Sequence, residues 1–300
     1  MKKKQHLLSI LTFNVNASLI IIFAALLILP FLSVAQNKSD FLDQLTFKEK
    51  INFNSYTNIY ETDVTYTVKQ IDSLIKKEAL PLSRQVASQG FSQKFYWLYF
   101  KIPKTTHPKK QLLLELNNPF IDQVELYEKA DNRFTKIGFG GDRNRAFSDR
   151  NYINRRFIFP INNNSKAIGY YLMIDKRNAS VSFPIYLWNK NTFENFEIKQ
   201  NLYYGLFFGV LCFISFLAII AGIITRRSLF LYYGAYTFFI ILYLFTTLGF
   251  SYQYLYPQSH HFNNYSRVIL IVLISVSSTL FLNKFLNIAT SIPIIVKAFK

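Results

Sequence analysis

The fold of this chain is decided by residues 201–257, which read NLYYGLFFGVLCFISFLAIIAGIITRRSLFLYYGAYTFFIILYLFTTLGFSYQYLYP. Two apolar runs without a charged residue lie in this stretch, at residues 202–224 and 229–250, and they are separated by Arg226 and Arg227. Crossing a hydrocarbon core takes about 20 helical residues, so each run is long enough to do so. The sequence therefore predicts two membrane-spanning helices joined by a tight turn.

A third apolar run, at residues 268–282, predicts a third span, so residues 201–300 are expected to form a partial transmembrane domain. Cytoplasmic loops are enriched in Lys and Arg, which places the turn with Arg226 and Arg227 in the cytoplasm. This orientation places residues 36–200 outside the membrane. The expected location is therefore a membrane, with residues 36–200 on its extracytoplasmic side.

The first 35 residues have the three parts of a secretory signal peptide. Three lysines near the start precede an apolar centre at residues 19–32, and Ser33-Val34-Ala35 gives the small-residue cleavage pattern. Cleavage would leave Gln36 as the mature N-terminus. It would also place the following residues outside the membrane, which is the orientation that the turn with Arg226 and Arg227 indicates. The alternative is an uncleaved anchor helix that begins near Leu7.

Residues 36–200 are predicted to form a β-sandwich, of jelly-roll type, with one short helix. Thr67 and Gln70 have the spacing of a helical capping box, and Ile71 and Ile75 follow at helical spacing. Seven runs alternate as strands do and are separated by turn-forming residues. These runs are residues 95–102, 112–116, 121–127, 134–139, 156–161, 170–174 and 181–188.

The charge of the chain follows this division. The formal net charge is +17, but all seventeen acidic residues lie between Asp40 and Glu197. Residues 36–200 hold twenty-five Lys and Arg, and the other nine basic residues of the chain flank the apolar runs. The membrane explains those nine, so nucleic acid is not an expected partner. The only cysteine, Cys212, lies inside an apolar run, which excludes a disulfide framework and a Cys-based metal site.

Three aromatic residues are candidates for a ligand platform: Trp97, Tyr99 and Trp188. Their ring faces can stack on the apolar face of a sugar or another flat ligand. The alternative is that these rings belong to the core, since Trp97 and Tyr99 share one strand face. Trp188 ends a run beside polar Asn189, which favours an accessible ring.

Five arginines crowd one short segment: Arg143, Arg145, Arg150, Arg155 and Arg156. Their guanidinium groups could clamp an anionic ligand, and a solvated hairpin with local acidic partners is the alternative. Arg150 and Arg156 are the two that we select as candidate ligand contacts. Arg150 lies in a turn-rich segment and is expected to be exposed.

Other motifs carry less chemistry. Gly205 and Gly209 form a GxxxG pattern, which lets helices approach closely, either within the chain or in a homodimer. His260 and His261 have no acidic neighbour in sequence, so no metal site and no cofactor are expected. No Ser-His-Asp arrangement, phosphate-binding loop, HExxH motif or carboxylate pair occurs in a convincing context, so an enzyme is not expected.

Several short motifs occur in a characteristic order. In the outer region they are YWL at 96–98, the run 112–127, GD at 141–142, FSDR at 147–150, RFIFP at 156–160, YYL at 170–172 and PIYLW at 184–188. In the membrane region they are YGLFFG at 204–209, RRSLFLYY at 226–233, Gly249 and YQYLYP at 252–257. In this order, which covers residues 45–290, the chain resembles the bacterial seven-transmembrane receptors with diverse intracellular signalling modules.

The resemblance implies an outer domain likened to carbohydrate-binding jelly rolls, seven helices and a variable cytoplasmic output module. The sequence departs from that pattern at Met173, where similar proteins tend to carry an Arg, and it has three spans before Lys300. We expect a membrane-bound sensor of a small-molecule or glycan ligand, which passes its signal through the helices. The alternatives are a truncated or non-signalling membrane-tethered binding protein and, less favoured, an enzyme of envelope polysaccharide.

Overall fold

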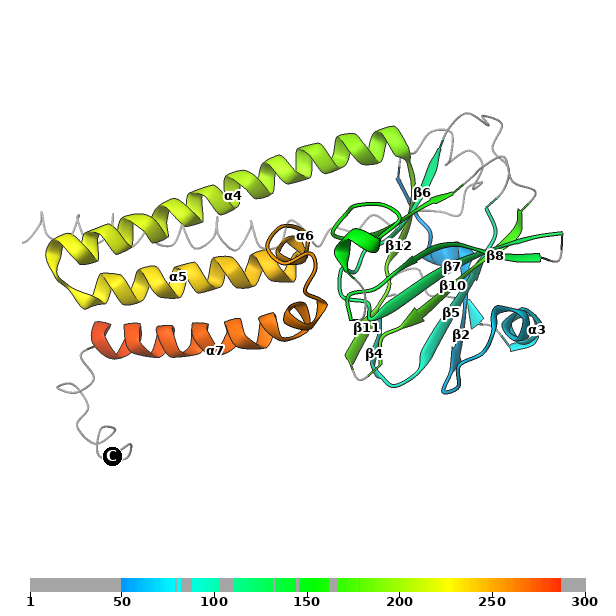
Figure 1. Ribbon diagram of the computed structural model, residues 1–300, viewed down its shortest axis with the longest axis horizontal. Helices are drawn as coiled ribbons and strands as arrows, with labels where there is room; N and C mark the ends of the chain where they lie inside the picture. Colours follow the sequence, from blue (N-terminus) through cyan, green and yellow to red (C-terminus); the bar gives the residue numbers. More distant parts are fainter. Residues whose placement is uncertain are drawn as a thin grey trace, which may run out of the picture. The chain divides into compact units, whose positions relative to one another are not determined.

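The computed structural model of the chain describes residues 50–286, apart from 79, 82–87, 103–110, 132, 144–145, 162–166 and 178. The expected signal peptide, residues 1–35, lies outside the described residues, and so does Arg145. The described chain contains two main sheets, a two-stranded ribbon, one helix and two short 3-10 turns between the strands, and four helices beyond the last strand (Figure 1).

The smaller of the two main sheets has four strands in the order β1-β12-β6-β9, and every pairing in it is antiparallel. The strands are β1 (Lys50–Asn52), β12 (Ile185–Asn189), β6 (Leu112–Leu116) and β9 (Phe157–Ile161). The register pairs Leu114 with Leu187 and with Phe159, so these three side chains share one face of the sheet. Trp188 and Leu113 share the opposite face.

The larger sheet has six strands in the order β3-β2-β5-β10-β7-β8. These are β3 (Leu80–Pro81), β2 (Thr57–Thr62), β5 (Phe95–Phe100), β10 (Ala167–Asp175), β7 (Gln123–Ala130) and β8 (Arg133–Gly140). A separate ribbon pairs β4 (Ser88–Ser92) with β11 (Ala179–Ser182), and two short 3-10 turns are η2 (Asn54–Tyr56) and η3 (Phe147–Asp149). The expected strand at residues 181–188 is therefore wrong as a single strand, because it is divided at Pro184 between β11 and β12.

The two main sheets pack face to face around an apolar core. A Cβ atom added at Gly138 would lie 2.5 Å from the ring of Phe159, and one at Gly140 would lie 2.8 Å from the ring of Phe157. Strand β8 therefore approaches β9 so closely that a larger side chain would not fit. The completely buried Leu98, Leu114, Leu116, Leu126 and Leu172 belong to strands of both sheets. The expected β-sandwich followed by membrane helices is confirmed.

Helix α3 (Val68–Glu78) covers the outer face of the larger sheet. The backbone N–H and the hydroxyl of Thr67 both donate to Gln70 Oε1, at 2.9 and 2.8 Å, so the predicted helix is confirmed, with the Gln70 half of its capping box. Ile71 and Ile75 pack on Trp97 and Tyr171. The helix thus lies over the aromatic strand face that the sequence offers as a ligand platform.

Four helices follow the sandwich: α4 (Lys190–Thr225), α5 (Ser228–Thr247), the short α6 (Phe250–Tyr254) and α7 (His260–Phe285). Three of them, α4, α5 and α7, are long and apolar enough to cross a membrane. Gly249 has φ +84° and separates α5 from α6, so the apolar run 229–250 is not one helix. Helix α7 begins eight residues before the apolar run at 268–282.

Close packing of the membrane helices depends on glycines other than those of the GxxxG pattern. A Cβ atom at Gly222 would lie 2.7 Å from the side chain of Leu231, and one at Gly234 would lie 2.7 Å from that of Ile219. The hydroxyl of Ser215 donates to the carbonyl of Gly234 at 2.9 Å, which adds a hydrogen bond between α4 and α5. At Gly205 and Gly209 a Cβ atom would meet no described atom within 4 Å.

Candidate functional site

The first turns of α4 lie against the outer face of the smaller sheet. Asn189 caps the helix, since its side chain accepts from the backbone N–H of Asn191 at 3.1 Å. Phe193 and Phe196 then pack on the indole of Trp188, with ring centroids 5.6 and 5.0 Å apart. The first membrane helix therefore begins as part of the outer domain, and its 36 residues continue without interruption to Thr225.

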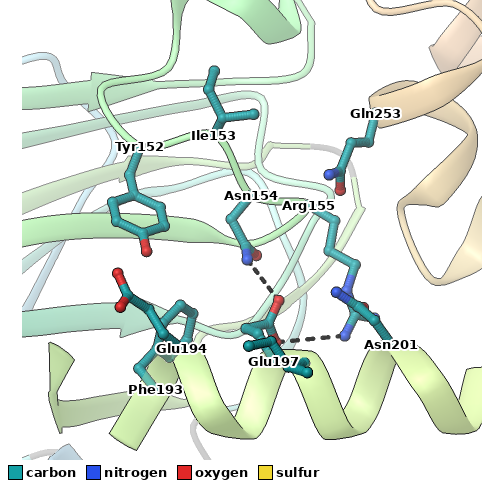
Figure 2. A pocket seen from close by; sticks show the side chains of 10 residues that line it. Tyr152, Ile153, Asn154, Arg155, Phe193, Glu194, Glu197, Asn201 and Gln253 are labelled. Atoms are coloured by element: carbon teal, nitrogen blue, oxygen red, sulfur yellow. Dashed lines mark hydrogen bonds and ion pairs between the residues drawn. The ribbon is translucent and has the colours of Figure 1, made fainter. Parts of the chain in front are cut away.

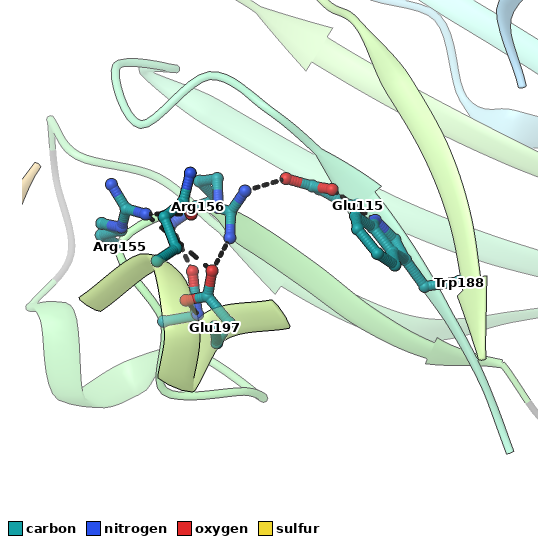
Figure 3. A network of polar contacts seen from close by, with 7 residues as sticks. Glu115, Arg155, Arg156, Trp188 and Glu197 are labelled. Atoms are coloured by element: carbon teal, nitrogen blue, oxygen red, sulfur yellow. Dashed lines mark hydrogen bonds and ion pairs between the residues drawn. The ribbon is translucent and has the colours of Figure 1, made fainter. Parts of the chain in front are cut away.

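A buried ion network joins this helix to the sheet (Figure 3). Arg156 Nη1 lies 2.6 Å from Glu115 Oε1, and Arg156 Nη2 binds Glu197 Oε1 on α4. The indole N–H of Trp188 donates to Glu115 Oε2 at 2.5 Å. Glu115 is completely buried in the middle of an apolar strand, so its charge needs these partners to offset the loss of hydration.

Two further residues contact the carboxylate of Glu197. The Asn154 amide donates to Glu197 Oε2 at 2.7 Å, and Arg155 Nη2 lies 3.9 Å from Glu197 Oε1. Arg155 also donates to Gln200 Oε1, one turn further along α4, at 2.7 Å. The segment before β9 thus holds α4 through three consecutive residues, at 5–7% exposure each.

Arg155 reaches a third element as well. Its guanidinium carbon lies 4.9 Å from the ring centroid of Tyr204 on α4 and 4.6 Å from that of Phe250 on α6. Phe250 packs in turn on Phe208 and Phe245 of the helices. A single arginine therefore contacts the outer domain, the first membrane helix and the connection between the second and third.

A second contact joins that connection to the outer domain. The backbone N–H of Phe147 donates to the carbonyl of Pro257 at 2.8 Å, and the rings of Phe147 and Tyr252 meet edge to face. The guanidinium of Arg150 lies over Phe147 and Phe157, 4.5 and 4.2 Å from their centroids. Arg150 also donates to the carbonyls of Asn154 and Arg155, at 2.7 and 3.0 Å. Those carbonyls belong to the segment that holds α4.

Asp142 lies beside this contact and is 2% exposed. Burial raises its pKa from 3.8 to about 6, against the opposing effect of the positive charges on Lys176, Arg150 and Arg267. Burial likewise lowers the pKa of Arg150 to about 10. One carboxylate oxygen of Asp142 has no hydrogen-bond partner in the described part of the chain.

A hollow of about 390 Å³ opens between these elements, which we call the junction pocket (Figure 2). Its walls come from the segment before β9, from the first turns of α4 and from α6. They are lined by Tyr152, Ile153, Asn154, Arg155, Phe193, Glu194, Glu197, Ile198, Asn201 and Gln253. Figure 2 shows the hydroxyl end of Tyr152 facing the carboxylate of Glu194, with the Asn154–Glu197 hydrogen bond beside them.

The five candidate ligand residues do not share one surface. Trp97 and Tyr99 belong to the larger sheet under α3, where Trp97 is buried and the ring of Tyr99 packs on Tyr171. Arg156 and Trp188 belong to the ion network beneath α4. The expectation of an accessible Trp188 is wrong, because α4 covers it.

The expectation of an exposed Arg150 is also wrong, because its turn-rich segment is covered by the connection between α5 and α7. Arg143 is the one described arginine of the crowded segment whose side chain is mostly exposed, at 57%. The rings of His260 and His261 lie 4.1 Å apart and are tilted by 44°, and the described residues contain no group of three His, Cys, Asp or Glu that could hold a metal.

Sequence reasoning missed Glu115 and Glu197, which hold the network together. One signal was present: Glu115 is the only charged residue in the apolar run 112–116, where an acid requires a buried partner. The partner could not be identified from sequence, because Glu197 follows 82 residues later and the pairing depends on how α4 docks.

Comparison with protein families matches both regions of the chain. The outer domain matches the family described as 7TMR-DISM extracellular 2 over residues 54–189, and residues 200–300 match 7TM diverse intracellular signalling. A comparison with curated proteins found no match. Both families describe receptor rather than catalytic domains, and they identify a membrane-anchored protein with an extracellular domain. The chain therefore belongs to the seven-transmembrane receptors with diverse intracellular signalling modules.

Proposed function

We propose that the outer domain binds a small ligand in the junction pocket and passes the signal to the membrane through α4. The observation that supports this proposal is the buried network in which Glu197, on the helix, is held by Arg156 and Arg155 of the sandwich. Because α4 continues without a break from this network to Thr225, a displacement of its first turns moves the whole helix.

The pocket is suited to such a change because three elements form its walls. A ligand shifts an equilibrium only by binding one arrangement more tightly than another. A molecule that contacts Tyr152, Glu194 and Gln253 at once would favour one placement of α4 and α6 on the sandwich. Carbohydrate is one candidate class, because the polar and aromatic wall residues suit hydroxyl groups and ring faces.

We place the protein in the bacterial inner membrane, with residues 36–200 in the periplasm. Arg226 and Arg227, in the turn between α4 and α5, support a cytoplasmic position for that turn. The signal-like residues 1–35 agree with this orientation. A hydrolytic role is not favoured, since Glu197 is engaged by two arginines and an amide and is poorly suited to move a proton.

The test uses the full chain in nanodiscs, with Cys212→Ser and a new cysteine at Asn201 in the pocket wall. Small sugars, amino acids and amines are screened for protection of this cysteine from a thiol reagent. A cysteine at Asp63, an exposed position outside the pocket, serves as the control. A ligand is expected to protect position 201 and leave position 63 reactive.

Transmission is then measured with spin labels at Thr225 and Phe285, the last residues of α4 and α7. We expect the distance between the labels to change when a protecting ligand is added, and to stay constant in Glu197→Gln. Protection without a distance change in the unaltered protein would instead indicate a membrane-tethered binding protein. If no compound protects position 201, the pocket is not the ligand site.

A further inference from the structure

The charges around the junction pocket leave one carboxylate without a counter-ion. Arg155 and Arg156 balance Glu115 and Glu197 in the ion network, and these four charges sum to zero. Glu194 also lines the pocket, and no Lys or Arg of the described chain forms an ion pair with it. The charged residues that line the pocket, Arg155, Glu194 and Glu197, sum to −1, while Lys50 interacts with Glu115 and Arg156 of the ion network.

We propose that the junction pocket binds a small organic amine as its ammonium ion, with Glu194 as the counter-ion. This inference rests on the proposed function of the pocket as the ligand site. A carboxylate within a few ångströms of an ammonium favours the charged amine, and the partly enclosed wall strengthens this attraction relative to open water. An anionic ligand would be repelled by Glu194, which has the Tyr152 hydroxyl as a hydrogen-bond partner but forms no ion pair with a described Lys or Arg.

Aromatic rings next to Glu194 fit the same ligand. Tyr152 and Phe193 meet edge to face, with centroids 6.1 Å apart, and both line the pocket. Ring faces attract cations, so these side chains can contact the ammonium or its neighbouring CH₂ groups. The pKa of Tyr152 is raised by burial first and then by the charges of Glu194 and Glu197, which agrees with a negative potential at this wall.

The opposite wall suits a second group on the ligand. Asn201 and Gln253 line it with side-chain amides that can donate. A hydroxyl, ether or carbonyl oxygen on the ligand could accept from these amides and would be stabilising here. Amino alcohols, amino sugars and the amine headgroup of a lipid all have this combination.

The rim of the pocket is apolar. Ile153 and Ile198 are 58% and 68% exposed, and α4 continues from Ile198 into exposed apolar residues at Leu202 and Tyr203. A hydrocarbon part of the ligand can therefore leave the pocket along these side chains. An amine could reach the pocket from solution or as a lipid headgroup, and the test separates these sources.

Binding is measured on the full chain in phosphatidylcholine nanodiscs. A Trp97→Phe background leaves Trp188 as the reporter, because Trp188 contacts the pocket residue Phe193. Glucosamine, glucose and glucuronate are titrated below neutral pH, since they share a ring but carry a positive, neutral and negative group. Ethanolamine gives a smaller amine. Nanodiscs with phosphatidylethanolamine or phosphatidylglycerol test the lipid source.

We expect at least one amine to bind with at least tenfold higher affinity than its neutral or anionic counterpart. Glu194→Gln should remove that preference, and Glu128→Gln, a matched change on β7 outside the pocket, should keep it. A response to phosphatidylethanolamine alone would identify a lipid source. If glucose or glucuronate binds as well as glucosamine, or if Glu194→Gln has no effect, the amine assignment is wrong while the ligand site stands. If no amine gives a saturable response, the amine assignment is also wrong.

Discussion

Arg156 and Glu197 form a buried ion pair that joins the segment before strand β9 to the second turn of helix α4. The same guanidinium binds Glu115, so the helix is connected to the middle of strand β6 through one side chain. Removing one member of a buried charged network leaves its partners uncompensated, and this is usually more costly than the net stabilisation of the intact network. The junction is therefore sensitive to single substitutions.

Glu197→Gln is expected to lower the free energy of unfolding of the outer domain by about 3 kcal/mol or more. The reason is that Arg156 would then keep only Glu115 as a carboxylate partner and Arg155 would lose Glu197, which leaves an excess positive charge in a buried site. Urea unfolding of the full chain in detergent, followed through Trp188 fluorescence in the Trp97→Phe background, measures the change. Glu194→Gln, one turn earlier on α4, is the matched control and should change stability by less than about 0.5 kcal/mol. Equal effects of the two substitutions would contradict the network.

Arg150→Ala is expected to destabilise the protein by about 2–4 kcal/mol. The substitution removes two hydrogen bonds to buried carbonyls and the contacts with Phe147 and Phe157. Thermal unfolding of the full chain in nanodiscs measures the loss. Arg143→Ala, with an exposed side chain in the same segment, should melt within about one degree of the unaltered protein. An Arg150→Ala protein with normal stability would show that Arg150 is not structural.

The fold was largely predictable because its signals are local. The alternation of Tyr96, Leu98 and Phe100 against Trp97 and Tyr99 predicts strand β5 correctly, since the period of two is a property of the strand itself. The capping box at Thr67 predicts α3 for the same reason. Pro184 shows the limit: residues 181–188 continue the apolar pattern, and only the tertiary structure divides them between two sheets.

The site was less predictable because it depends on what covers each residue. Trp97 has the expected aromatic neighbours, yet α3 lies over them, and nothing in the strand pattern indicates where that helix docks. Arg150 is in a turn, and turns are usually exposed, but the connection that contains Tyr252 packs on it. Contacts between segments far apart in the sequence decided both cases.

Asp142→Asn is expected to change how stability depends on pH. Asp142 has a folded pKa of about 6, above its usual value of 3.8, so the folded state binds more protons between these values. Asp142 therefore contributes most to the free energy of unfolding at low pH. This contribution, about 3 kcal/mol at most, is lost as the pH rises through about 6. The difference in melting temperature between Asp142→Asn and the unaltered chain should grow from pH 4 to pH 7, in favour of the variant. A constant difference would show that Asp142 does not titrate in this range.

The orientation is tested with cysteines on both sides of the membrane in a Cys212→Ser background. Ser148→Cys, an exposed position of the outer domain, should react with an impermeant thiol reagent in intact spheroplasts. Arg227→Cys, at the turn between α4 and α5, should react only after lysis. The reverse pattern would overturn the proposed orientation.

Gly234 and Gly205, both in the membrane helices, should differ in their tolerance to larger side chains. Gly234→Leu is expected to separate α4 from α5, because even a Cβ atom would lie 2.7 Å from Ile219 and 3.2 Å from the carbonyl of Ser215. Gly205→Leu should leave helix packing intact, since the described structure has no atom within 4 Å of that Cβ position. Resistance to thermal unfolding in detergent separates the two, and Gly234→Leu should melt well below Gly205→Leu.

The free face at Gly205 also allows a test of the homodimer that its GxxxG spacing with Gly209 suggests. Small residues promote association only where another helix approaches them, and no described helix of the same chain does so here. If two copies associate through this face, Gly209→Ile should shift the full chain from dimer to monomer in light scattering while its melting temperature stays unchanged. A dimer fraction that is the same in both proteins would exclude this face as the contact. A monomer in both would leave these glycines facing lipid or a helix beyond the described residues, and the homodimer prediction would be wrong.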